Sequence, residues 1–234
     1  MSDPLNSPVV RHSPSTGPNS PDVWGIYEPD TGSIQYICAD PITKKAALID
    51  VVWNFDPKNY RFSQESMDQV LDLVAENGLT VDWVLDTHPH ADHVMASAHL
   101  KARTGAPNAI GALVPEIAKI WADLYNLPEA FDPDRDFDRL FQEGESFKIG
   151  DLDVKIMLSP GHTLGSITYV FGDAAFVHDT LMQPDAGTSR SDFPGGKTHE
   201  LWDSIQDILA LPGHTRLFIG HDYGTDNRKE PMWE

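Results

Sequence analysis

The stretch Thr87-His88-Pro89-His90-Ala91-Asp92-His93 places three imidazoles and one carboxylate within six residues, directly after the apolar run Trp83-Val84-Leu85. Neutral imidazole is the commonest metal ligand in proteins, and a turn after a strand lets alternate side chains converge on one point. The spacing does not match the HExxH arrangement, in which two histidines share one helical face. The stretch therefore predicts a metal site at the end of a strand.

The composition is that of a soluble globular protein. The chain has 234 residues, 40% of them hydrophobic, which is enough for one domain or a small pair with a proper core. A formal charge of −19 argues against nucleic acid or an anionic membrane as a partner. No run approaches the roughly 18 apolar residues of a spanning helix, and the start lacks the order of a signal peptide. Cys38 is the only cysteine and excludes an intramolecular disulfide, so we expect a cytoplasmic location.

Residues 1–22 differ in composition from the rest of the chain. They contain five prolines among many Ser and Asn residues, with few side chains able to anchor a core. This composition predicts a disordered tail, followed by one domain over residues 23–234.

The remaining pattern alternates short β-type runs with amphipathic helices. We expect strands at 23–27, 33–39 and 46–52, a helix at 63–77 capped by Ser63, and a strand at 81–86 before the histidine-rich loop. After it we expect helices at 96–103 and 115–125, a strand at 109–112, and a loop at 127–138. The second half adds strands at 146–149, 153–158, 166–171, 174–177 and 216–219 with a helix at 198–211. This order predicts an α/β fold in which two sheets pack face to face with helices outside.

Three later segments each deliver a possible ligand just beyond an apolar run. They are Ser159-Pro160-Gly161-His162-Thr163, Val177-His178-Asp179-Thr180 and Ile219-Gly220-His221-Asp222-Tyr223. Because each run is a predicted strand, His88, His162, Asp179 and His221 are expected to meet at a common rim of the sheets.

This order of THxHxDH, PGHT, a later Asp and a late His resembles the metallo-β-lactamase superfamily across about residues 23–223. The resemblance implies an αββα sandwich of two mixed sheets with the metal site at the rim between them. It leaves the reaction open, because this fold hosts hydrolases, nucleases and oxygen-using enzymes.

A narrower resemblance lies downstream of Asp179. Residues 187–196, GTSRSDFPGG, are similar to the RxDFxxG signature of persulfide dioxygenases, as is His221-Asp222-Tyr223. The resemblance implies one Fe(II) per chain held by His88, His162 and Asp179. Such an enzyme would oxidise glutathione persulfide, or a related low-molecular-weight persulfide, with O2 to sulfite and thiol. His90, Asp92, His93 and His221 would then orient the ligands by hydrogen bonds.

The alternative is a thioester hydrolase similar to glyoxalase II, with two Zn, Fe or Mn ions. In that family His88, His90 and His162 would bind one ion, Asp92, His93 and His221 the other, and Asp179 would bridge. All seven residues are present. The dioxygenase signature, and the short stretch after Tyr223 where glyoxalase II has a glutathione-binding helical domain, favour the dioxygenase. In this chain, the link from Asp179 to Arg190 is about two residues longer than in animal-type dioxygenases. In addition, His178 stands where glycine is frequent in that family. Both departures suggest a bacterial branch of the family.

Two residues outside the metal motifs are candidates for substrate binding. Arg190 could hold a substrate carboxylate, or pair with Asp192 instead. Tyr223 could offer a hydroxyl or an aromatic wall near the sulfur, or be an ordinary packed aromatic residue. The expected partners are a small-molecule persulfide and O2; the resemblance is also compatible with a homodimer. Relatives of this kind usually continue for tens of residues beyond the position of Glu234, so two interpretations stay open: a shortened C-terminus or a natural end.

Overall fold

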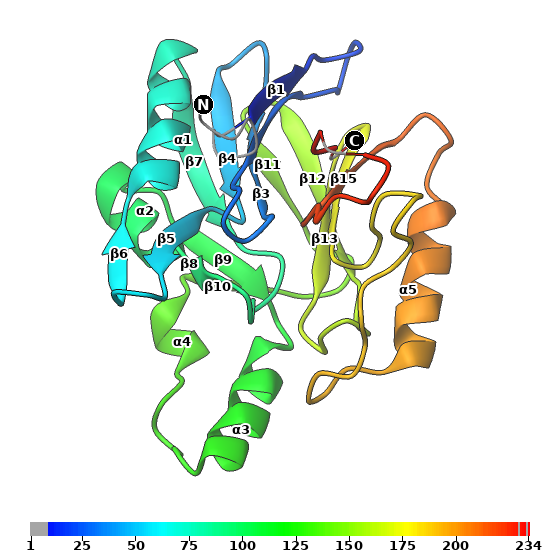
Figure 1. The fold of residues 1–234 in the computed structure, drawn as a ribbon. Coiled ribbons are helices and arrows are strands. Elements are labelled where there is room, and N and C mark those ends of the chain that lie inside the picture. The colour runs from blue at the N-terminus through cyan, green and yellow to red at the C-terminus, as the bar shows by residue number, and fades with distance from the viewer. Residues whose placement is uncertain (1–8, 229, 233) are drawn as a thin grey trace.

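The computed structural model describes residues 9–228, 230–232 and 234 (Figure 1). Its largest sheet has seven strands. Their spatial order is β1-β2-β3-β4-β7-β9-β10. Strands β1 to β4 pair antiparallel, and β7, β9 and β10 continue the sheet in parallel. The bounds are β1 (Val9–Ser13), β2 (Asp22–Tyr27), β3 (Ile34–Ala39), β4 (Lys45–Ile49), β7 (Thr80–Leu85), β9 (Asn108–Gly111) and β10 (Arg139–Phe141).

A second sheet of five strands runs in the order β11-β12-β13-β14-β15. It is antiparallel except for its last pair, β14 with β15. Its strands are β11 (Ser146–Ile149), β12 (Leu152–Leu158), β13 (Ile167–Phe171), β14 (Ala174–His178) and β15 (Arg216–Ile219). A small third sheet joins β6 (Arg61–Ser63), β5 (Val52–Asp56) and β8 (Val94–Met95).

Helices cover the outer faces of the two large sheets. Figure 1 shows α1 (Glu65–Glu76) and α2 (Ser97–Thr104) on one side and α5 (Thr198–Leu209) on the other. Helices α3 (Val114–Tyr125) and α4 (Pro133–Asp136) lie together at one end. The αββα sandwich predicted from the sequence is therefore confirmed. In the described part of the chain, no helix combines the length and apolarity needed to cross a bilayer.

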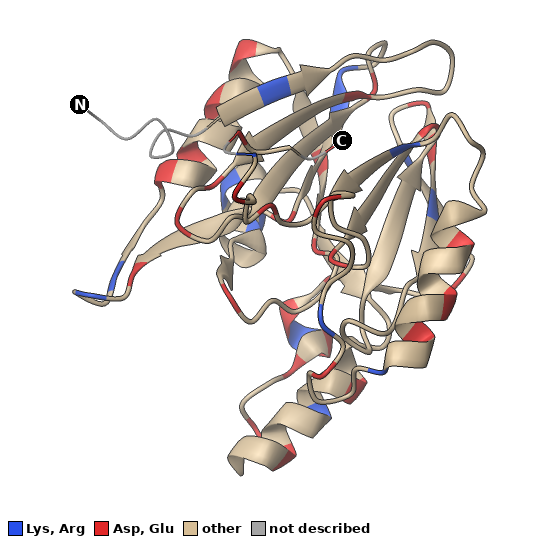
Figure 2. Cartoon of the chain, turned by 45° about the vertical axis from the view of Figure 1, so that its right-hand side comes forward, with Lys and Arg blue, Asp and Glu red and all other residues tan. Residues whose placement is uncertain are grey.

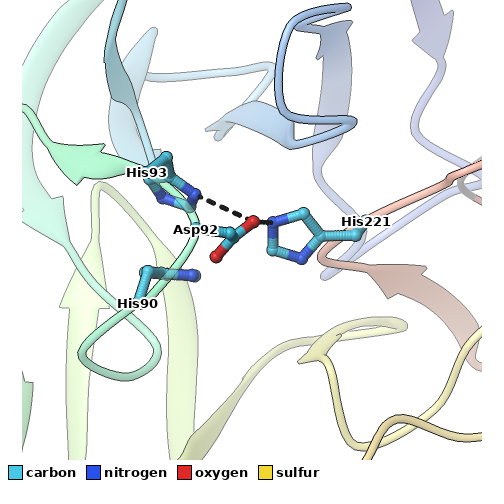
Figure 3. A group of neighbouring side chains, drawn as sticks. All are labelled: His90, Asp92, His93 and His221. Atoms are coloured by element: carbon cyan, nitrogen blue, oxygen red, sulfur yellow. Dashed lines mark ion pairs between the residues drawn. The ribbon is translucent and has the colours of Figure 1, made fainter. Parts of the chain in front are cut away.

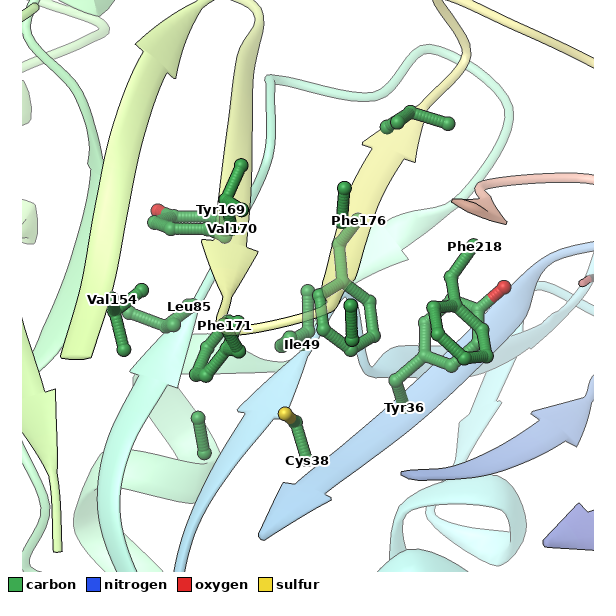
Figure 4. Packing of buried hydrophobic residues seen from close by; sticks show 14 of the residues in the cluster. Tyr36, Cys38, Ile49, Leu85, Val154, Tyr169, Val170, Phe171, Phe176 and Phe218 are labelled. Carbon is green, nitrogen blue, oxygen red and sulfur yellow. The ribbon is translucent and has the colours of Figure 1, made fainter. Parts of the chain in front are cut away.

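The main core lies between the two sheets (Figure 4). Tyr36 of β3 meets Phe176 and Phe218 of the second sheet edge-on, at centroid distances of 5.1 and 5.6 Å. Cys38 is fully buried in this cluster, and burial raises the pKa of its thiol well above the ordinary value. The side chain acts as a small apolar filler, as its strand context predicts. A second cluster, which includes Met67 and Leu100, joins α1 and α2 to the first sheet.

The predicted disorder of residues 1–22 is wrong for residues 9–22, while residues 1–8 lie outside the described part. Val9–Ser13 form β1, which pairs along its whole length with β2. Arg216 fixes the segment that follows β1, because its guanidinium donates to Ser13 Oγ at 2.9 Å and to the carbonyl of Pro21 at 3.0 Å. The same guanidinium pairs with Asp173 at 2.9 Å. Composition does not report such long-range partners.

Several predicted elements also differ in the structure. The run 46–52 divides into β4 and β5 because Asp50 between them adopts a φ of +50°. Helix α1 begins at Glu65 with Gln64 at its cap, because Ser63 belongs to β6. The predicted loop 127–138 contains the short helix α4, and the edge strand β10 follows it.

Charge is unevenly distributed over this fold. Figure 2 shows many acidic positions on helices and loops and few basic ones. The expectation that nucleic acid and anionic membranes are not partners rests on this same excess of acidic residues and stays a prediction.

Candidate metal centre

Several strand ends from both large sheets meet at one rim. His88 follows β7 of the first sheet, whereas Asp179 follows β14 of the second. His162 lies in the loop after β12. Nε2 of His88 lies 3.5 Å from Oδ2 of Asp179, and Nε2 of His162 lies 3.6 Å from the same oxygen. The structure therefore brings together the three residues that the dioxygenase resemblance assigns to iron.

Hydrogen bonds fix which nitrogen of His88 and of His162 faces the centre. Nδ1 of His162 lies 2.8 Å from the carbonyl oxygen of Arg190, which can only accept, so this nitrogen carries the proton. The Thr87 hydroxyl donates to Asp50 at 2.7 Å, so its oxygen accepts from Nδ1 of His88 at 3.0 Å. Both rings are thereby held with the Nε2 lone pair directed toward Asp179, as ligands require.

The other four predicted residues form a second group beside the first (Figure 3). Ligand atoms of His90, Asp92, His93 and His221 all lie within 4.8 Å of one another. His221 is held on both sides by carboxylates, with Nδ1 2.7 Å from Asp179 and Nε2 2.7 Å from Asp92. Asp179 therefore joins the two groups, because its second oxygen faces His88 and His162.

Burial and charge set the protonation of this cluster. Burial, together with the neighbouring His88 and His93, lowers the pKa of His90 to about 3, so its ring is neutral at pH 7. Burial alone would also lower the pKa of His221, but Asp179 and Asp92 raise it to about 10. The charge of His221 in turn holds the pKa of Asp179 well below its usual range, against the effect of burial. Asp179, His221 and Asp92 thus form a carboxylate–imidazolium–carboxylate chain beside the neutral ring of His90.

The donor set fits a transition-metal ion. Nδ1 of His90 and Nε2 of His93 are buried, and neither has a hydrogen-bond partner among the described residues. A buried nitrogen without a partner costs free energy, which an ion at the same position would offset. Imidazole and carboxylate ligands suit Fe, Zn or Mn. His88, His90 and Asp179 also group within 4.8 Å, so His90 lies between two candidate ion positions.

Comparison with known proteins agrees with this geometry. The family model described as the metallo-beta-lactamase superfamily matches residues 36–221. The chain belongs to the metallo-β-lactamase superfamily. It is 51% identical over 215 residues to the "Beta-lactamase hydrolase-like protein" of Xylella fastidiosa, covering 92% of this chain and 50% of that protein. The chain thus spans about half the length of the first curated relatives that it matches.

More distant relatives carry two different activities in their names. The human mitochondrial persulfide dioxygenase ETHE1 is 27% identical over 201 residues, covering 85% of this chain and 67% of that protein. A hydroxyacylglutathione hydrolase of Rhodospirillum rubrum is 33% identical over 162 residues, covering 68% and 56%. The crystal structure of ETHE1 from Myxococcus xanthus matches with a TM-score of 0.66 and 29% identity, covering 92% of this chain and 76% of that one.

Arg190 and Tyr223, the two candidates for substrate binding, line the cavity that opens at the rim where His162 and Asp179 lie. Arg190 pairs with Asp192 through Nη2 at 2.8 Å and lies over the Phe193 ring, as the alternative interpretation of this residue expected. Its backbone carbonyl accepts a hydrogen bond from His162, so the signature segment directly contacts a predicted ligand. Tyr223 is 67% exposed and stacks on His221 at a centroid distance of 5.5 Å. It is therefore not a packed core residue.

Sequence reasoning missed Asp50, Ser33 and a role for His178. Asp50 anchors the histidine loop, and Ser33 Oγ lies 3.0 Å from His93 and 3.1 Å from His221. Asp50 directly follows an apolar run and Ser33 directly precedes one. This position at the end of a predicted strand is the signal that could have identified both residues. His178 is buried with a φ of +43°, a conformation that glycine adopts without strain. The backbone conformation explains why glycine suits this position. The imidazole that occupies it here lies beside His88, with 5.1 Å between the ring centroids.

Proposed function

We propose that this chain is a persulfide dioxygenase that acts on a low-molecular-weight persulfide, such as glutathione persulfide, at a single non-haem Fe(II). The observation that carries the proposal is the orientation of His88 and His162. Each ring holds its Nδ1 proton away from the centre and directs Nε2 toward the same oxygen of Asp179. Two histidines and one carboxylate on one face are typical of non-haem Fe(II) oxygenases.

The proposed reaction balances with one persulfide, one O2 and one water. The outer sulfur is oxidised to sulfite, O2 is reduced, the S–S bond breaks, and the carrier returns as a thiol with release of two protons. A bound ferrous ion would supply adjacent coordination positions for the two substrates. The cavity reaches His162 and Asp179, so a persulfide can approach them from the outside.

The protein residues would orient the substrate at this face. Tyr223 lines the same cavity, and its side chain is 67% exposed. Its phenol can therefore donate a hydrogen bond to a substrate sulfur. Arg190 pairs with Asp192 and also lines the cavity, so its side chain would contact a bound substrate.

A thioester hydrolase with two ions is the second candidate, and one observation favours it. The buried nitrogens of His90 and His93 that have no partner in the described chain lie on the side of His221, where a second ion would bind.

The test is oxygen uptake by Fe(II)-reconstituted protein on addition of glutathione persulfide, with S-lactoylglutathione hydrolysis as the parallel assay. We expect uptake with sulfite formation and one iron per chain. His162→Ala should lose the iron, whereas His93→Ala should retain it, and His199→Ala on the exposed face of α5 is the matched control. Thioester cleavage with two ions per chain and no oxygen uptake would replace the proposal with the hydrolase.

A further inference from the structure

The cavity at the metal rim extends well beyond the ligands. Its volume is about 930 Å³, and it runs from His90, His162 and Asp179 to the arm formed by α3 and α4. This is near the upper end of the range for small-molecule sites, which is about 300–1,000 Å³. The space is therefore larger than a persulfide group needs, and its outer part must receive the carrier to which the sulfur is attached.

One face of α3 forms an apolar wall in this outer part. Ile117, Trp121 and Tyr125 recur at four-residue spacing and all line the cavity. The rings of Trp121 and Tyr125 stack at a centroid distance of 5.3 Å. Tyr125 is 58% exposed and Phe131, on the same side of the cavity, is 45% exposed. Large apolar side chains thus face open space inside a concave site.

The wall is held close to the ligand loops. A Cβ atom on Gly165, three residues after His162, would lie 2.7 Å from Cδ1 of Ile117. A Cβ on Gly195 would lie 3.2 Å from Cδ1 of Ile120. The two glycines therefore permit α3 to pack directly on the segments that carry His162 and the dioxygenase signature. A substrate sulfur at the ligands would place its carrier along α3.

The charged groups at the outer part of the cavity are already paired. Among the described residues that line it, Arg190 is the only lysine or arginine, and it is held by Asp192. Arg135 pairs with Asp136 at 2.8 Å and lies 4.0 Å from Asp132. The two carboxylates of glutathione would therefore meet no unpaired cation in this described lining, whereas alkyl or aryl surface would meet aromatic rings.

We propose that the carrier is an apolar alkyl or aryl group that packs against Ile117, Trp121 and Tyr125. The preferred substrate is thus a hydrophobic thiol persulfide, and glutathione persulfide, used above as the assay substrate, is a weaker one. The identification of the reacting group as a persulfide rests on the proposed function. The preference for an apolar carrier rests on the cavity alone.

The test separates binding from turnover. Ethanethiol, butanethiol, hexanethiol and glutathione are titrated into the metal-loaded protein by calorimetry, and oxygen uptake is measured with the corresponding persulfides. Each buried methylene is expected to tighten binding by about fourfold, so hexanethiol should bind about two orders of magnitude more tightly than ethanethiol. Glutathione should bind more weakly than hexanethiol.

Matched variants locate the effect. Trp121→Ala should flatten the dependence on chain length, and so should Tyr125→Ser, whose exposed position makes a folding defect less of a concern. Trp202→Ala is the control, because Trp202 is a 61% exposed tryptophan on α5 that does not line the cavity. Equal affinity across the series, or tighter binding of glutathione, would overturn the proposal. A steep dependence without oxygen uptake from any persulfide would support the apolar carrier and reject the dioxygenase.

Discussion

Replacement of Asp50 by Asn tests how the histidine loop is anchored. The buried Asp50 carboxylate accepts hydrogen bonds from the Thr87 amide at 2.8 Å and the Thr87 hydroxyl at 2.7 Å, and His90 Nε2 lies 3.4 Å away. Asn has the same size but carries no charge and offers one acceptor oxygen instead of two. One of these donors therefore loses its partner inside the protein.

Two routes give the same magnitude for Asp50→Asn. Burial alone would raise the pKa of Asp50, but His90 and Thr87 lower it from 3.8 to about 2. At about 1.36 kcal/mol per pKa unit, this shift corresponds to roughly 2 kcal/mol of folding stability at pH 7. A lost hydrogen bond to a charged group costs about 1.5–3 kcal/mol. We therefore expect Asp50→Asn to lower the free energy of unfolding by about 2–3 kcal/mol.

The pH dependence provides a second check. Because the folded pKa lies below the unfolded value, the stabilisation by Asp50 is complete above about pH 5 and is lost as the pH falls toward 2. The difference between wild type and Asp50→Asn should therefore shrink to about half at pH 3.

The assay is urea unfolding of the EDTA-treated protein at pH 7 and pH 3. The control is Asp153→Asn, since Asp153 is an exposed carboxylate whose ion pair with Lys148 should contribute less than about 1 kcal/mol. An Asp50→Asn variant within about 0.5 kcal/mol of wild type at pH 7 would refute the reasoning.

Three further predictions concern buried groups away from the cavity wall. Arg216→Ala should lower the free energy of unfolding by about 3 kcal/mol, because the buried Asp173 carboxylate loses its ion-pair partner, and proteolysis should then cut the segment after β1 faster. At the positive-φ position of His178, the Gly variant should be more stable than the Ala variant by about 1 kcal/mol in thermal unfolding, and equal stability would contradict the strained backbone. Burial, and then the charge of Asp50, raise the pKa of Asp86 to about 8. Folded Asp86 therefore retains its proton where the unfolded chain has lost it, so wild-type stability should fall from pH 4 to pH 8, and Asp86→Asn should reduce this fall in urea titrations.

The metal residues were predictable because their signal is local. Each follows an apolar run, and strands of a sandwich end at shared rims, so His88, His162, Asp179 and His221 could be placed together before the structure was known. The alternation of strand and helix patterns also carried the fold class. These inferences need only the spacing at which apolar residues recur and the turn residues between the apolar runs.

The residues that were missed act through distant partners. Arg216 contacts Ser13 across 203 positions, and Ser33 contacts His221 across 188. The proline-rich and serine-rich composition of residues 1–22 predicts a disordered tail. The part after β1 is nevertheless ordered, because the guanidinium of Arg216 donates hydrogen bonds to its carbonyls. Asp50 appeared to be an ordinary strand end because Thr87, its main partner, lies 37 residues away.

The metal rim also links the two sheets mechanically. His88 comes from the first sheet, whereas Asp179 and His221 come from the second, so the ligand set exists only when the sheets are docked. An ion that binds only the folded chain stabilises it by about 2.7 kcal/mol at one hundred times its dissociation constant. This is similar to the expected cost of Asp50→Asn. A metal-loaded variant should therefore unfold near the urea midpoint of the metal-free wild type, provided that Asp50 positions His88 without changing its affinity. If Asp50→Asn lowers the free energy of unfolding more in the metal-loaded protein than in the metal-free protein, the Asp50–Thr87–His88 chain also sets how tightly the ion is held.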